Sequence, residues 1–573
     1  MKKILLIFVG LVLAAQIGFA GGIVTNTNQS TSWTRMLVRD ASTQIDAVFY
    51  NPAGLVKLND GFHFSVSNQF LFQKQTITTS NQFLNNKEYV GNISAPLFPG
   101  IYGAWKKGRV AVSIGFNPIG GGGGASFDNG LPSMETPFAG LVPQLSAGMQ
   151  PVFAGTGGMI TERYPTAYNM NMSFEGTSVY FGLQAGLSFE ITENIAVFAG
   201  ARYVWAKNTY KGAISNVTVD VNGDKVSPGN YVGGIQSDVT DLSEQAAAGA
   251  TMANGAAASM DPIINGGGGT FTLQELLGAQ MITQEQYNQL VGGLVTAGIP
   301  QDQINGMSAA EVQGTYFAVG TELDAQSQQL AGVAQELGAQ VYYLNTVTAD
   351  QEADVVETGN GITPIVGANI SLMEEKLNFG IKYEFETKMD LTTEVNDNKG
   401  FVTGLDDQGQ NVYMFNDGEV NNADIPAYLS IGAQYEIIDP LRVQLGYHVY
   451  FDKDVEWATA EDGTKLIDNN FAEYGIGLEY DITESLLISG GFLMARTGAN
   501  ENYQSDLSYS LSTNTFGGGF AYKINDKLTA QLGGFFVSYM EQSYDKIDVA
   551  GEPFQDTYDK QTWAISIGVD FSL

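Results

Sequence analysis

The chain has 573 residues, a formal net charge of −34 and no cysteine. The missing cysteines exclude disulfides and thiolate metal sites, and the acidic balance argues against nucleic acid as a partner, because nucleic acids bind basic surfaces. The two histidines, His63 and His448, both lie in strand-like runs. We therefore expect ordinary strand positions for them rather than a catalytic pair or a metal site.

Residues 1–20 predict a secretory signal peptide. Lys2 and Lys3 provide the charged start, residues 4–13 the apolar core, and residues 18–20 a small-residue cleavage site. We expect the mature chain to begin near Gly21. After the signal, no apolar run approaches the roughly 20 residues that a membrane-spanning helix needs.

Residues 21–60 predict a small plug. Within it, residues 30–43 mix apolar side chains with charged ones, which suits a short helix. Arg35 and Arg39 stand four residues apart, so on a helix they would share one face and could hold a carboxylate of a ligand. The alternative is that both arginines pair with carboxylates of the plug itself or of the barrel lumen.

The end of the plug carries a compact apolar turn. Asn51-Pro52 disfavours helix at Asn51, and Gly54 permits a backbone conformation that most residues avoid. By itself this segment could be a loop packed on a sheet. We expect it to hold the plug against the inner wall, and we take as candidate site residues the motif Asn51, Pro52, Ala53 and Gly54 and the ligand-binding aromatics Phe49 and Tyr50.

From Phe62 onward the hydrophobic pattern has a period of two, as in a strand with one apolar face. Each alternating run is about the 9–11 residues that a tilted strand needs to cross a bilayer. The last strand shows the pattern best, with Trp563, Ile565, Ile567, Val569, Phe571 and Leu573 alternating with small or polar residues. Tight turns recur between the runs at 106–109, 191–194, 373–376, 437–440, 482–485 and 524–527, and longer connections lie at about 118–173, 213–360, 393–424, 456–468, 499–505 and 542–560.

Short turns at one end and long loops at the other are typical of an outer-membrane barrel. Six turns join strands in pairs, and the first and last strands bring the number to about fourteen. We therefore predict an all-β membrane protein, an antiparallel transmembrane β-barrel over residues 61–573 with an N-terminal plug and both chain ends periplasmic. A soluble sandwich or propeller is the alternative, and the signal peptide and the aromatic last strand weigh against it.

The connection over residues 213–360 differs from the others. Capping boxes begin at Thr272, Thr283 and Ser308, and apolar residues at three- and four-residue steps after Ser308 predict a long helix. We expect a large extracellular insertion that forms a helical lid with an apolar groove; the alternative is a helical hairpin that only covers itself. No Lys or Arg occurs from 226 to 375, so this insertion offers no cation to a carboxylate.

The third predicted strand, residues 110–116, runs directly into Asn117-Pro118 and a run of glycines. Proline cannot donate to a sheet ladder, and glycines pack no side chain against their neighbours. Pro118 could simply end the strand at the outer surface. Our hypothesis is a kink at Gly115, Pro118 and Gly120 that interrupts pairing and leaves a side opening in the wall.

Other motifs carry no chemistry. Residues 220–224 space their carboxylates like half of a calcium loop, but Lys225 replaces the expected glycine and Tyr231 the expected glutamate, so we predict a turn. Residues 120–124 are glycine-rich without the Gly-Lys-Ser/Thr of a phosphate loop. No Ser-His-Asp arrangement with a recognisable elbow is present. We expect no metal, no cofactor and no enzymatic activity.

Taken together, these features resemble the FadL-type outer-membrane transporters. Phe49–Leu55 is similar to the plug motif of that family, and Asp424–Ala427, which opens the predicted eighth strand, is similar to a second family pattern. The resemblance spans the mature chain. It implies passive uptake of hydrophobic molecules, such as long-chain fatty acids, across the outer membrane, and it favours a kink in the third strand without fixing its residues.

Two departures from the family concern the third long loop, which is longer than expected and lacks cations. The substrate is therefore neutral, or its head group is held further in. A general diffusion porin, or a barrel whose large loops bind a partner, is the alternative function. We expect a monomer in contact with a hydrophobic ligand, membrane lipid and lipopolysaccharide.

Overall fold

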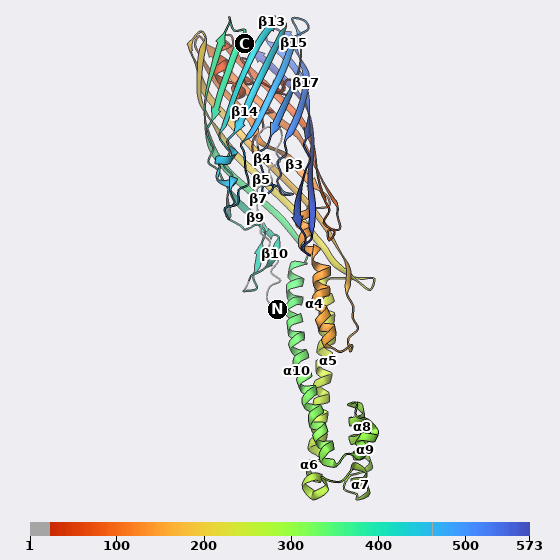
Figure 1. Cartoon of the computed structure of the whole chain (residues 1–573). Coiled ribbons are helices and arrows are strands. Elements are labelled where there is room, and N and C mark those ends of the chain that lie inside the picture. The colour runs from red at the N-terminus through yellow and green to blue at the C-terminus, as the bar shows by residue number, and fades with distance from the viewer. Residues whose placement is uncertain (1–22, 407, 461) are drawn as a thin grey trace. The chain divides into compact units, whose positions relative to one another are not determined.

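The computed structural model describes residues 23–406, 408–460 and 462–573, which form two compact units. The first unit is a closed antiparallel barrel (Figure 1), as predicted, and fourteen strands of the described chain form its wall. These strands are β1 (Gly61–Thr79), β2 (Glu88–Lys107), β3 (Val110–Phe127), β4 (Pro165–Thr192), β5 (Ile195–Val221), β7 (Gln351–Leu372), β8 (Leu377–Glu384), β13 (Tyr428–Ile438), β14 (Leu441–Tyr450), β15 (Phe471–Asp481), β16 (Leu486–Arg496), β17 (Thr513–Asn525), β18 (Leu528–Tyr539) and β20 (Pro553–Ser572).

The first and last strands pair with each other and close the wall. The β1–β20 ladder runs from His63 opposite Ser572 to Thr79 opposite Asp556. On β20, the alternating apolar side chains from Trp563 to Phe571 are 36–49% exposed, whereas Ala564 and Ser566 between them are buried. Because the barrel has no free edge and turns its large apolar side chains outward, it has the surface of a membrane-spanning barrel.

Among the helices of the described residues, none is long and apolar enough to cross a bilayer.

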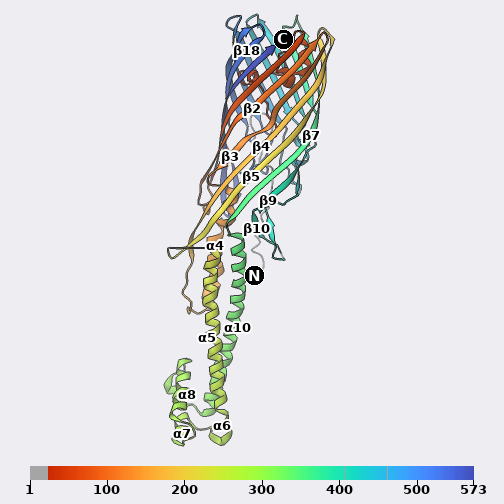
Figure 2. The same cartoon turned by 180° about the vertical axis from the view of Figure 1, so that it is seen from behind.

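Several strands are much longer than the predicted 9–11 residues. The strands β1, β2, β3, β4, β5, β7 and β20 have 18 to 28 residues each, and Figure 2 shows β2, β3, β4, β5 and β7 running side by side. Pairing therefore continues beyond the length that a bilayer requires. In particular, β3 continues through Pro118 to Phe127, and β5 and β7 extend into the range that the sequence assigned to the third loop.

The segment before β1 contains three short helices, which are α1 (Thr31–Thr34), α2 (Ala47–Tyr50) and the 3-10 helix η1 (Pro52–Lys57). The predicted helix over 30–43 is thus wrong beyond Thr34. Leu37 has a φ of 67°, a left-handed conformation that ends any helix passing through it. We call residues 23–60 the plug, because most of its side chains are buried against inward positions of the wall.

The second unit contains α4 (Leu141–Gly155), from the connection before β4, and the helices of the long insertion. The insertion helices are α5 (Pro228–Ser259), α6 (Asp261–Ile263), the π-helix η2 (Ile264–Gly268), α7 (Leu273–Gly278), α8 (Gln284–Thr296), α9 (Gln301–Gly306) and α10 (Ala309–Val347). The helices α5 and α10 pack side by side (Figure 1). The three predicted capping boxes are confirmed at Thr272, Thr283 and Ser308, as is the long helix after Ser308.

The remaining elements lie in the connections between the wall strands. They are α3 (Pro132–Ala139), β6 (Asp224–Val226), β9 (Asp390–Gly400), β10 (Val402–Leu405), β11 (Asn411–Tyr413), β12 (Val420–Asn422), η3 (Asp452–Asp454), η4 (Glu456–Ala458) and β19 (Gln542–Ile547). The predicted turn at 220–224 is confirmed, because Asn222 and Gly223 take positive φ between the paired strands β5 and β6. The predicted signal peptide, residues 1–20, lies outside the described residues.

Candidate ligand site in the barrel lumen

The inner wall is shaped for the plug by glycines. A Cβ atom added to any of ten wall glycines would come within 3 Å of an atom of plug residues 31–41, so larger residues would push this part of the plug away. We call these ten residues the glycine belt; it spans eight strands and consists of Gly380, Gly432, Gly446, Gly475, Gly477, Gly491, Gly517, Gly519, Gly533 and Gly568. Their partners lie between Thr31 and Ala41, so this stretch of backbone lies directly on the wall.

The motif at the end of the plug is also held by the wall. The Asn51 amide donates to the Ser42 carbonyl (3.1 Å) and to the Asn369 side chain on β7 (2.8 Å). The Pro52 carbonyl, in the first turn of η1, accepts from the Ser188 hydroxyl on β4 at 2.6 Å.

The two small residues of the motif are completely enclosed. Ala53 is fully buried against Phe198 and Ile365, and a Cβ on Gly54 would collide with the Ser42 carbonyl. The four motif residues therefore fix the backbone of the plug at its second end.

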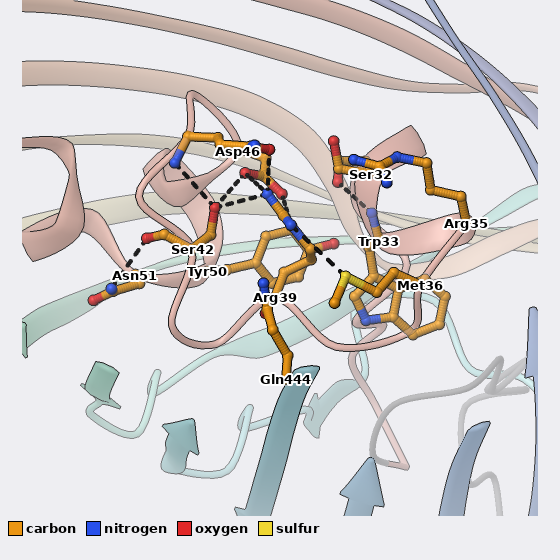
Figure 3. A network of polar contacts seen from close by, with 12 residues as sticks. Ser32, Trp33, Arg35, Met36, Arg39, Ser42, Asp46, Tyr50, Asn51 and Gln444 are labelled. Carbon is orange, nitrogen blue, oxygen red and sulfur yellow. Dashed lines mark hydrogen bonds and ion pairs between the residues drawn. The ribbon is translucent and has the colours of Figure 1, made fainter. Parts of the chain in front are cut away.

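Arg39 organises the interior of the plug, as Figure 3 shows. Its guanidinium binds both carboxylate oxygens of Asp46, at 2.6 and 2.9 Å, and donates to the Ser42 hydroxyl at 2.9 Å. The Ser42 hydroxyl in turn donates to Asp46 at 2.7 Å. This bidentate pair is the geometry in which arginine binds a carboxylate most strongly, and the pKa of Arg39 is raised by the neighbouring Asp46 against the opposing effect of burial.

Arg35 joins the plug to the wall. Its guanidinium lies 2.6 Å from Glu479 on β15 and also donates to Ser489 and Gln531. Glu479 is shared with Arg39 at 3.8 Å and with Arg442 at 3.5 Å. Both plug arginines are thus bound to protein carboxylates in this conformation, and they reach Glu479 from an extended turn rather than from one helical face.

A second contact between plug and wall uses a residue that the sequence marked as ordinary. His448 on β14 lies 2.7 Å from Asp40 of the plug and 2.7 Å from Glu473 on β15. The Ser430 hydroxyl donates to the same Asp40 carboxylate at 2.7 Å. His448 therefore occupies a strand position, as predicted, and additionally bridges the plug to the barrel.

Cations and aromatic rings meet around Phe49, the predicted ligand-binding aromatic of α2. The Lys382 ammonium on β8 lies 4.4 Å from the centre of the Phe49 ring, and the Arg202 guanidinium on β5 lies 5.1 Å from it. Both cations bind one carboxylate, Glu384, at 2.8 and 2.6 Å. Lys382 also donates to the Phe49 carbonyl at 2.7 Å and lies 5.2 Å from the Tyr428 ring.

We call Phe49, Arg202, Lys382, Glu384 and Tyr428 the lumen site. A cavity of about 20 Å³ beside it has room for about one water molecule. This cavity is lined by the plug residues Thr25, Asn26 and Thr27, by Phe49, Arg202 and Glu384, and by the wall residues Ile119, Ile425, Pro426, Tyr428 and Tyr450. Two buried cations that share one carboxylate can accept a second anion, and the rings and aliphatic residues can hold an apolar chain.

Arg202, Lys382 and Glu384 were not among the residues predicted from the sequence. The available signal was their position at the small or polar face of alternating strands, in a chain with only 27 Lys and Arg. Predicted Tyr50 lies beside this site rather than in it, because its hydroxyl donates to the Thr27 carbonyl at 2.7 Å and accepts from the Gln29 backbone at 2.8 Å. Ile425 and Pro426 of the second motif line the cavity.

The third strand contains a break in its ladder. Across the described residues of the β2–β3 hairpin, pairing stops after Ile101–Phe116 and resumes at Ser94–Gly124. On its other side, β3 stays paired with β4 through two irregularities, at Pro118/Gly120 and Gly121/Gly123. Gly115 is paired on both sides, so the interruption of the β2–β3 ladder covers residues 117–123 and includes the predicted Pro118 and Gly120 but not Gly115.

The plug supplies hydrogen bonds at this break. The Asn26 backbone donates to the Ile119 carbonyl at 2.7 Å, and the Asn26 side chain donates to the Gly121 carbonyl at 2.6 Å. Thr25 forms a bridge with Gly120. Carbonyls that lost their partner strand are therefore bound from the inside.

Comparison with solved structures shows the fold. A FadL homologue from Pseudomonas aeruginosa aligns over 96% of this chain and 99% of its own, with 12% identity and a TM-score of 0.52. The toluene transporters TodX from P. putida and TbuX from Ralstonia pickettii align over 92% of this chain and 94% of theirs, at 12% and 13% identity with TM-scores of 0.45 and 0.41. No protein-family model and no curated protein matches the sequence. The chain therefore has the FadL-type fold, that of a multi-pass outer-membrane barrel.

Proposed function

We propose that the barrel carries hydrophobic molecules passively across the outer membrane, and that the lumen site binds the head group of a long-chain fatty acid. The observation that supports this most directly is the pair of buried cations, Arg202 and Lys382, beside the aromatic ring of Phe49. A carboxylate there would be bound by two cations, while its alkyl chain would be shielded from water by the apolar residues of the cavity.

The position of the cations supports a head-group site inside the barrel. Residues 226–375 contain no Lys or Arg, so the helical insertion cannot neutralise a carboxylate. The neutral part of a ligand can be captured outside, but its anionic end is favoured only where cations are available. Of the two alternatives for the substrate, these positions support a head group held further in.

Binding requires the plug to move. A cavity of about 20 Å³ cannot hold an alkyl chain, and three plug residues line it. We therefore infer that ligand entry displaces the plug segment 25–27 from beside the lumen site. The plug-filled lumen also argues against a general diffusion porin, whose channel would be open to water.

The break between β2 and β3 is the exit that we propose. A gap in a transmembrane ladder is costly in lipid unless its polar groups are bound elsewhere, and here Asn26 of the plug binds two of the carbonyls. Leu97 beside the break is 74% exposed, and Phe116, Phe181 and Trp205 stack near it with ring centres 5.6–6.0 Å apart. An apolar ligand leaving here would pass from aromatic rings directly into the membrane.

Paired ligands test the head-group assignment. Equilibrium binding of oleate and of oleyl alcohol is measured on the purified full-length protein in neutral detergent. Lys382→Met should weaken oleate binding by about 10- to 150-fold, the worth of a hydrogen bond to a charged group, and leave oleyl alcohol nearly unchanged. Glu384→Gln should strengthen oleate binding, because it removes the carboxylate that competes for both cations.

The matched control is Lys399→Met, which removes the same charge from a side chain that is 40% exposed and paired with the exposed Glu352. It should change neither affinity. Equal binding of acid and alcohol by the wild type, or an equal loss of both in Lys382→Met, would contradict a carboxylate site.

A further inference from the structure

The helical unit carries a groove that is separate from the lumen site. Three helices form it: α5 contributes Met252 and Ala256, α8 contributes Gly293, and α10 contributes Val319 and Leu323. Its volume is about 1050 Å³, at the upper end of the roughly 300–1,000 Å³ that small-molecule sites occupy.

The groove exists because α8 presents small residues at this point. Leu290, Val291 and Leu294 of α8 face the core that it shares with α5 and α10. Gly293 lies against Tyr316 of α10, whose hydroxyl donates to the Leu290 carbonyl at 2.6 Å, and a Cβ there would collide with that hydroxyl. The small residues on the walls of the groove would let the backbone of another helix approach closely, as in helix packing at about 8–10 Å between axes.

An apolar side chain is left exposed in this groove. Met252 is 70% exposed although it lines the groove between two packed helices. Methionine is flexible and adapts to varied apolar partners, which suits a binding surface. Leu323 and Val319 on the opposite wall are half-buried, so the floor remains accessible.

The acidic charge of the helical insertion restricts which molecules can bind in the groove. Residues 226–349 contain eleven Asp or Glu and no Lys or Arg, and Glu322 lies on the groove itself. A second copy of this chain would bring the same charges together, and anionic lipid or lipopolysaccharide would be repelled as well. A neutral hydrocarbon would offer no opposite charge to Glu322.

We propose that this groove, lined by Met252, Ala256, Gly293, Val319, Glu322 and Leu323, docks a cationic amphipathic helix of a partner protein. Its apolar face would cover Met252 and Leu323. Its lysine or arginine stems would extend along the groove walls and bring a positive charge to Glu322. The interaction is independent of the lumen site.

The probe is a synthetic fluorescent peptide of about 18 leucines and lysines, with leucines at helical spacing. Binding to the full-length protein in neutral detergent is followed by anisotropy. A peptide of the same composition with leucines dispersed should bind at least about tenfold more weakly, and one with glutamate in place of lysine should not bind.

Two charge reversals on one helix separate the groove from general attraction. Glu322→Lys should weaken peptide binding by about tenfold, whereas Glu336→Lys, about 21 Å further along α10 and outside the groove, should change it less than about twofold. Equal losses in both variants, or no binding to the wild type, would overturn the proposal.

A second pair of variants fills the groove. Ala256→Trp should reduce binding by at least about tenfold, and Ala247→Trp, at an exposed position of α5 outside the groove, should not. Circular dichroism checks that the helices remain folded. If Ala256→Trp unfolds them, the comparison of the two charge reversals still tests whether the peptide binds in the groove. Displacement of the peptide by a neutral alkane at equimolar concentration would instead indicate a hydrocarbon site and overturn the proposal.

Discussion

Two adjacent glycines of β16 give a direct test of how the plug is seated. Gly491 belongs to the glycine belt, and a Cβ there would overlap the carbonyl oxygen of Met36 in the plug. Gly490 faces the other side of the strand, where a Cβ would lie 3.6 Å from the Gly517 carbonyl oxygen, an ordinary contact. We expect Gly491→Ala to displace the plug and Gly490→Ala to leave it in place.

The magnitude follows from the overlap. A methyl group at position 491 needs the Met36 backbone to move by about 1 Å or more, and overpacking of this kind typically costs about 1–3 kcal/mol. If the cost falls on the seated plug only, the ratio of seated to displaced plug falls by about 5- to 150-fold. Both variants carry the same alanine in the same strand, so any general effect on β16 cancels.

Ion conductance in planar lipid bilayers reports the result. Gly491→Ala should show more frequent or longer conducting events than the wild type, and Gly490→Ala should match the wild type. The same contrast is expected on β17 between Gly517, which lies against Leu37 of the plug, and Gly518, which does not. Equal conductance within each pair would refute the view that the glycine belt seats the plug.

Four further predictions concern single contacts or segments. Glu479→Gln should also raise conductance, because it leaves a buried guanidinium without its carboxylate at a cost of about 3–5 kcal/mol. Asn51→Ala and Pro52→Ala should change uptake of labelled oleate more than they change the heat resistance of the folded barrel in gel-shift assays; normal uptake with poor refolding would leave the motif a folding element only. Deletion of residues 228–347 with a short Gly/Ser bridge should leave a heat-modifiable barrel, since the helices of this stretch carry their own caps. Burial raises the pKa of Asp452 from 3.8 to about 7, so the contribution of this carboxyl group to stability is complete below about pH 4 and lost above about pH 7. Asp452→Asn should therefore slow amide exchange around residue 452 much more at pH 8 than at pH 5. The difference corresponds to at most about 4 kcal/mol in the free energy of local opening.

The wall of the barrel could be predicted because its signal is local and repeated. Every strand alternates between a face in lipid and a face in the lumen, so the period of two recurs wherever the chain crosses the membrane. The tight turns between strands are local features as well. The predicted turn at 373–376 is formed by three consecutive non-glycine residues with positive φ, Met373, Glu374 and Glu375. The caps at Thr272, Thr283 and Ser308 are local as well, and all three were predictable.

The lumen site could not be predicted, because its residues come from separate strands and from the plug. Arg202 and Lys382 are 180 positions apart and meet only where β5, β7 and β8 lie beside α2. The predicted helix at Arg35 and Arg39 failed for a related reason. Contacts with Glu479 and with the glycine belt determine that backbone, and they outweigh a helical pattern of only a few residues.

The break in β3 and the plug residues beside it account for one another. Pro118 on β3 and Pro96 and Pro99 on β2 have no backbone donor, so fewer unpaired N–H groups are left where the two strands separate. The carbonyls that remain at Ile119 and Gly121 are bound by Asn26. The same short segment, residues 25–27, lines the cavity at the lumen site. On the proposed route, a ligand that occupies this cavity must push the segment away, and that movement also releases the carbonyls at the break. Entry of the ligand and opening of the wall would then be one event, because one segment closes both.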